Sequence, residues 1–103
     1  MGSRIGNIVY SSAIGGGRSE SADEQAQAMF ENIRKFMTAA GGTPDDIIKV
    51  TLLLKDDAYR KNIDPEWLKM FPDPECRPAR HAEITNRLGQ GMMACEIIAV
   101  LDH

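Results

Sequence analysis

The chain has 103 residues, of which 43% are hydrophobic and 26% are charged, a composition that suits one globular domain over residues 1–103. Its formal net charge is -3 with both signs interspersed, so nothing favours nucleic-acid binding. No stretch is apolar enough to span a membrane, and no secretion signal is expected, because nothing at the N-terminus resembles a charged-then-apolar segment. Two isolated cysteines and two histidines favour a cytoplasmic location and argue against a metal site.

The first half of the chain predicts a strand followed by a helix. Residues 5–12 form a short β-type run that the glycines at 15–17 end. This glycine stretch lacks the lysine and hydroxyl residue of a phosphate-binding loop, so a plain connection is favoured. Residues 21–24 have the S-x-x-E form of a capping box, which predicts a helix start. Apolar residues then recur at three- and four-residue spacing until Gly41 and Gly42 end the helix.

The middle of the chain predicts a second strand and a second helix. Residues 47–54 alternate in the manner of a strand packed on the first helix. The face expected to be buried carries Ile48, Val50, Leu52 and Leu54. Asp64 followed by Pro65 resembles an N-cap and a first helical residue, so the second helix is expected to begin there and to end before Pro72.

Two further strands are expected over residues 79–85 and 92–101, separated by a glycine-containing turn. The resulting order of strand, helix, strand, helix, strand, strand predicts an α/β (α+β) domain with a mixed sheet and two helices on one face. The other face of the sheet is left uncovered. In a protein this small, identical subunits are its natural cover.

Two charged residues lie on apolar faces of these last strands. Alternation places Arg80 on the face that carries Ala82 and Ile84, and Glu96 shares a face with alternate apolar residues of the last strand. A charge removed from water needs compensation, so the two residues are paired with each other, hydrogen-bonded, or lining a wet pocket. The pattern leaves both a structural ion pair and a ligand site open. The planar fork of an arginine suits a carboxylate ligand.

Several motifs occur in the same order as in the RidA (YjgF) family, from about Gly6 to Val100. Residues 46–56, DIIKVTLLLKD, are similar to the family's D-V-V-K-x-T-V-F-L-x-D segment. Residues 77–80, RPAR, resemble its R-P-A-R signature, and residues 96–100, EIIAV, resemble its closing E-x-I-A strand. The resemblance implies a chorismate-mutase-like fold and a homotrimer with three clefts at the subunit interfaces.

The resemblance also implies a reaction without a cofactor, the hydrolytic deamination of enamine and imine intermediates of amino acids to 2-oxo acids and ammonia. Arg80 would hold the carboxylate of the 2-imino or 2-enamino acid, and Glu96 would orient or activate the attacking water. Ser11 would hydrogen-bond the ligand, although a serine bonded locally to the backbone is an equal interpretation. The alternative function is a non-catalytic trimeric module that binds small carboxylates or stabilises proteins.

The chain departs from the family pattern at several positions. Ser12 and Ala13 stand where Gly-Gln is usual, and an N-terminal segment with a pocket-facing tyrosine is expected to be missing or replaced. Trp67, in place of a common tyrosine, is expected in the core or an interface, and Asp64 replaces a common asparagine. His81 is expected as a surface or interface side chain rather than a pocket group. The changes at Ser12, Ala13 and the N-terminus favour the alternative function. A ribonuclease activity, which the family's label suggests, has no electrostatic support in an acidic chain.

Overall fold

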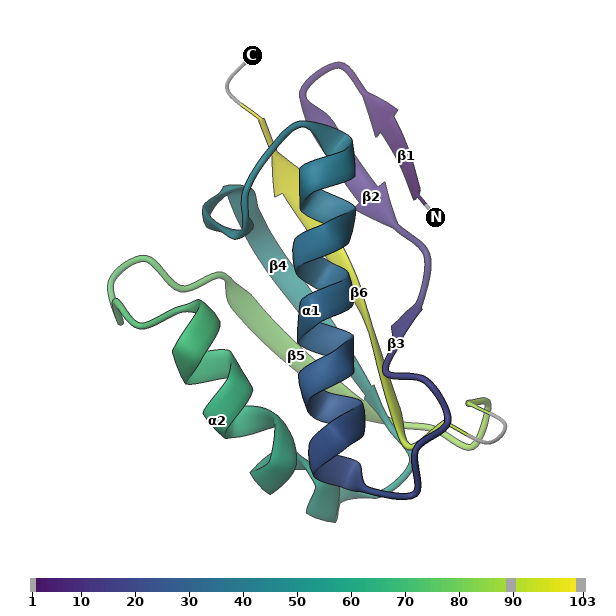
Figure 1. The fold of residues 1–103 in the computed structure, drawn as a ribbon. Helices are drawn as coiled ribbons and strands as arrows, with labels where there is room; N and C mark the ends of the chain where they lie inside the picture. The colour runs from purple at the N-terminus through teal and green to yellow at the C-terminus, as the bar shows by residue number, and fades with distance from the viewer. Residues whose placement is uncertain (1, 89–90, 102–103) are drawn as a thin grey trace.

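A computed structural model describes residues 2–88 and 91–101 (Figure 1). Its elements are β1 Gly2–Ile5, β2 Ile8–Ser11, β3 Ile14–Gly15, α1 Ala22–Ala40, β4 Ile47–Leu54, α2 Arg60–Met70, β5 Ala79–Ile84 and β6 Met93–Val100. The sheet order is β1-β2-β6-β4-β5, with β3 also paired to β6. Strands β4 and β5 are parallel and the other pairs are antiparallel. The predicted mixed α/β fold with two helices is therefore confirmed.

Helix α1 forms where the sequence predicts it. The Ser21 side chain accepts a hydrogen bond from the Glu24 backbone N–H, and Gly41 ends the helix in the left-handed conformation at φ 88°. The Glu24 carboxylate does not complete the capping box, because it accepts from the hydroxyl of Ser19 instead. The apolar stripe is buried against the sheet and consists of Ala26, Met29, Phe30, Ile33 and Met37.

The N-terminal strand prediction was too simple. The run over residues 5–12 is broken at Gly6, whose φ of 58° forms a turn, and β1 before it pairs with β2 as a hairpin. Glycine adopts such a φ without steric cost, so the break has a local cause. A strand thus precedes the first one that the sequence indicated.

The face assignment of β4 was wrong at one residue. The register with β6 shifts between Ile47 and Lys49, and such a bulge inserts one residue that reverses the alternation. Ile48 is therefore 52% exposed, whereas Ile47 is buried. The other predicted inward residues of β4 are buried.

The predicted start of the second helix was also wrong. Helix α2 begins at Arg60, after a 3-10 turn over Asp57–Tyr59 whose N-cap, Asp56, accepts from the Ala58 N–H. Pro65 lies inside the helix. The cap upstream begins the helix early, which leaves the Asp64 carboxylate to interact elsewhere. The helix ends at Met70, as the following prolines predicted.

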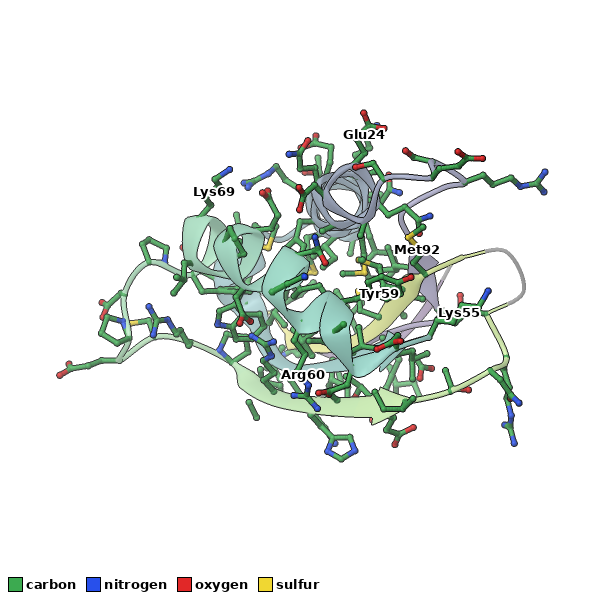
Figure 2. All side chains as sticks on the ribbon, turned by 90° about the horizontal axis from the view of Figure 1, so that it is seen from below. Glu24, Lys55, Tyr59, Arg60, Lys69 and Met92 are labelled. Carbon is green, nitrogen blue, oxygen red and sulfur yellow. The ribbon has the colours of Figure 1, made fainter. Side chains whose placement is uncertain are left out.

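The two helices cover one face of the sheet, with side chains packed between the layers (Figures 1 and 2). The opposite face carries exposed apolar side chains, at Ile5 (71%), Ile8 (39%), Tyr10 (41%) and Val100 (37%). We call this set the open-face patch. No part of the chain that the structure describes covers it. In the same described ranges, no helix combines the length and the apolar composition required to cross a bilayer.

Candidate functional site

Arg80 lies on β5, the strand at one edge of the sheet. It pairs in register with Val50, a core residue of β4, so its side chain is on the helix-covered face. Its Nη2 donates to Asp64 Oδ1 at 2.7 Å. Its guanidinium carbon is 5.1 Å from the centre of the Trp67 ring. Asp64 and Trp67 are three residues apart on α2, a spacing that places both on one helix face.

Asp64 and Trp67 both interact with the charge of Arg80, but they leave its side chain partly exposed to solvent. The Arg80 side chain is 24% exposed and that of Asp64 is 53% exposed. Trp67 is buried at 6% exposure and its ring lies 4.8 Å from that of Phe71, so its predicted place in the core is confirmed. A pair between Arg80 and Glu96, one of the alternatives from the sequence, is not formed.

Glu96 lies on the other face of the sheet. It pairs with Thr51 of β4, which follows the Arg80 partner Val50 and therefore points to the opposite side. Its side chain is exposed, in the same row of the sheet as His81, which also pairs with Thr51. A single chain thus does not bring Arg80 and Glu96 together.

Ser11 lies at the end of β2 and is partly buried. Its Oγ accepts a hydrogen bond from the Ile97 backbone N–H at 2.8 Å. The serine is therefore bonded to the backbone, as one of its two interpretations had it, but the bond is not local because its partner lies on β6, far along the chain. The hydroxyl proton is not used in that bond, and Ile97 is adjacent to Glu96 in β6.

His81 lies on the open face of the sheet, away from Arg80. Its ring Nε2 is 3.3 Å from Glu83 Oε1, and its side chain is 58% exposed. It is a surface side chain of this chain, as the sequence predicted.

Sequence reasoning missed two polar residues. Asp64 was interpreted as a helix cap, although its place beside Arg80 could have been suspected from the unpartnered charge on β5. Gln25 is 1% exposed and joins two loops: its Nε2 donates to the Ser19 carbonyl and its Oε1 accepts from Met92 N–H at 2.9 Å. Figure 2 shows Met92 below the end of α1 that carries Glu24. No sequence signal distinguishes Gln25 from exposed helical glutamines.

One hollow among the described residues lies away from Arg80. A cavity of 560 Å³ is lined by the glycines at 15–17, Arg18, Arg87 and neighbouring residues. Arg80, Glu96 and Ser11 are not among its lining residues. A Cβ at Gly16 would lie 2.0 Å from the Gln25 carbonyl oxygen, so this glycine is needed for close packing of the loop on α1.

The chain matches a known protein family over nearly its whole length. The family described as Endoribonuclease L-PSP matches residues 2–101. The chain belongs to this family, the YjgF/RidA family. The resemblance stated from residues 46–56, 77–80 and 96–100 is thereby confirmed.

The sequence identity to individual members of the family is low. The chain is 32% identical over 62 residues to Reactive Intermediate Deaminase A, chloroplastic, of Arabidopsis thaliana; the match covers 60% of this chain and only 32% of that protein. The crystal structure of RidA from the Antarctic bacterium Psychrobacter sp. PAMC 21119 is similar with a TM-score of 0.88 and 28% identity, over 97% of this chain and 85% of that chain. Yeast Mmf1 shares the fold with a TM-score of 0.87 at 24% identity, over 96% and 83% of the two chains.

Proposed function

We propose that this protein hydrolyses reactive enamine and imine intermediates of amino acids. Membership of the YjgF/RidA family and the similarity to a reactive intermediate deaminase support the proposal. Water adds to the carbon of the C=N bond, and the resulting carbinolamine expels its nitrogen as ammonia. The products are one 2-oxo acid and one ammonia for each imino acid and water consumed. By family likeness, the reaction proceeds without a cofactor.

The observation that carries the proposal is that Arg80 is partly exposed and keeps N–H donors for a ligand. Asp64 is the hydrogen-bond partner of its guanidinium among the described residues and takes one of its five N–H donors. The side chain remains 24% exposed. The remaining donors suit the carboxylate of a 2-imino acid, because arginine binds carboxylates through two charge-assisted hydrogen bonds.

Glu96 would act on the water. An exposed carboxylate can accept a proton from water as it attacks the imine carbon and return it to the departing nitrogen. Because an imine carbon is already electrophilic, positioning contributes more than a strong base. Ser11, beside the same strand, would donate its hydroxyl proton to the ligand.

A site that uses both charged residues requires two subunits, because Arg80 and Glu96 lie on opposite faces of one sheet. We propose a homotrimer with a chorismate-mutase-like fold, in which the open face of one subunit lies against the β5 edge of its neighbour. The open-face patch supports this arrangement, since exposed apolar groups of this kind mark interfaces. A cytoplasmic location and a single domain over residues 1–103 remain predictions.

The first test compares wild type with Arg80→Ala. Imino acids are generated from amino acids by an amino-acid oxidase, and release of 2-oxo acid and ammonia is followed. We expect the wild type to accelerate release and the variant to lose at least about tenfold in kcat/KM, because one charge-assisted carboxylate contact disappears. Arg60→Ala, which removes another arginine paired with an aspartate, is the matched control and should retain activity. Equal rates for wild type and Arg80→Ala would contradict the proposal.

The alternative function is a non-catalytic trimer that binds small carboxylates or stabilises proteins. The departure from Gly-Gln at Ser12 and Ala13 favours it. It would be supported if no imine is hydrolysed faster than in buffer while pyruvate binds the wild type and not Arg80→Ala.

A further inference from the structure

Helix α2 holds the Arg80 side chain from two directions. Asp64 accepts one N–H at 2.7 Å, and the Trp67 ring lies 5.1 Å below the guanidinium carbon. The ring is itself fixed, because Trp67 is buried and packs on Phe71. Both contacts come from one face of one helix, while Arg80 comes from the edge strand.

The two contacts restrict different motions of the guanidinium. A ring face attracts a cation and favours a guanidinium lying over it. A charge-assisted hydrogen bond restricts rotation within that plane. An arginine on an edge strand would otherwise lose much conformational freedom when it binds a ligand. Order that is already present in the free protein therefore favours binding.

We propose that Asp64 and Trp67 are positioning residues that hold Arg80 ready for the carboxylate of its ligand. This rests on the proposed function in one respect, that a carboxylate binds at Arg80. Neither residue needs to touch the ligand. Trp67 holds the guanidinium from beneath, and Asp64 fixes one edge and leaves the remaining donors to the incoming carboxylate.

The opposite role for Asp64 would be that of an internal competitor for the arginine. A competitor would occupy the fork with both carboxylate oxygens, whereas the contact here joins one oxygen to one nitrogen. Asp64 is also half exposed, so water screens its repulsion of a bound anion. The geometry therefore favours positioning, and the two roles predict changes of opposite sign.

The test measures pyruvate binding by calorimetry and imine hydrolysis by 2-oxo acid release, with the full chain. We expect Asp64→Ala and Trp67→Leu each to raise the Kd for pyruvate and the KM for imine by about three- to tenfold, with a smaller effect on kcat. Asp64→Asn, which keeps an oxygen acceptor, should restore most of the affinity, and so should Trp67→Phe, which keeps a ring. Asp57→Ala removes an exposed aspartate paired with Arg60 and is the matched control.

The possible outcomes distinguish a failure of the positioning role from a failure of the proposed deaminase function. Unchanged affinity in Asp64→Ala, or tighter binding, overturns the positioning role even if Arg80→Ala abolishes deamination. If no variant or wild type hydrolyses imines but Arg80→Ala, Asp64→Ala and Trp67→Leu all weaken pyruvate binding, the deaminase function fails and the positioning role stands. A wild type that binds no pyruvate and hydrolyses no imine overturns both. Should Trp67→Leu fail to fold, Asp64→Ala decides, because that side chain is exposed.

Discussion

Gln25 is a buried polar residue whose two hydrogen bonds join the loop before α1 to the segment before β6. Replacement by leucine would leave the Ser19 carbonyl and the Met92 N–H without these partners in a part-buried site. Unmade hydrogen bonds of this kind cost about 1–3 kcal/mol each. We expect Gln25→Leu to lower the free energy of unfolding by about 2–4 kcal/mol in urea titrations at fixed protein concentration. Gln27→Leu, at an exposed site on the same helix, should change it by less than about 0.5 kcal/mol; equal effects would contradict this role.

Strand alternation indicated Arg80 and Glu96 as candidate residues, because it places charges reliably on one face of a sheet or the other. It did not reveal their relation, since alternation within a strand says nothing of which sheet face the helices cover. Asp64 shows the same limit. Its N-cap signature is local, whereas its actual partner lies 16 residues away on another element.

At the scale of elements, the long amphipathic helix and the alternating strands were predictable from periodicity. The predictions failed where a single residue changed the alternation of a strand or the start of a helix. The bulge at Ile48 and the turn at Gly6 depend on backbone geometry that apolar patterning does not encode. The start of α2 depended on a competition between two caps, Asp56 and Asp64, that sequence alone does not decide.

Strand β6 buries a thiol whose protonation reports on the fold. Burial, with the nearby charge of Glu96, raises the pKa of Cys95 from its ordinary value of 9.0 to about 12. Between these values the unfolded chain releases a proton that the folded chain keeps, so the free energy of unfolding falls as pH rises. At pH 8 we expect a disulfide reagent to modify exposed Cys76 in the native protein and Cys95 only after unfolding. A Cys76→Ser variant should then be unreactive when folded, and rapid native labelling would contradict the burial of Cys95.

At the scale of the whole molecule, the opposite placement of Arg80 and Glu96 allows a complementation test. If each cleft takes Arg80 from one subunit and Glu96 from the next, Arg80→Ala and Glu96→Gln chains are each inactive alone. Refolded together in equal amounts, they should form trimers in which about a quarter of the clefts carry both residues. We therefore expect about a quarter of wild-type deaminase activity in the mixture, and none in either variant refolded alone. Absence of recovery in trimers shown to be mixed would contradict a shared cleft.

If the chain assembles as proposed, the open-face patch also affects what happens to the chain before assembly. Newly synthesised chains at low concentration would expose apolar side chains to the solvent. Such exposure favours aggregation and recognition by chaperones and proteases. A substitution that weakens association would then reduce how much protein accumulates in the cell, even where the chemistry of each cleft is untouched.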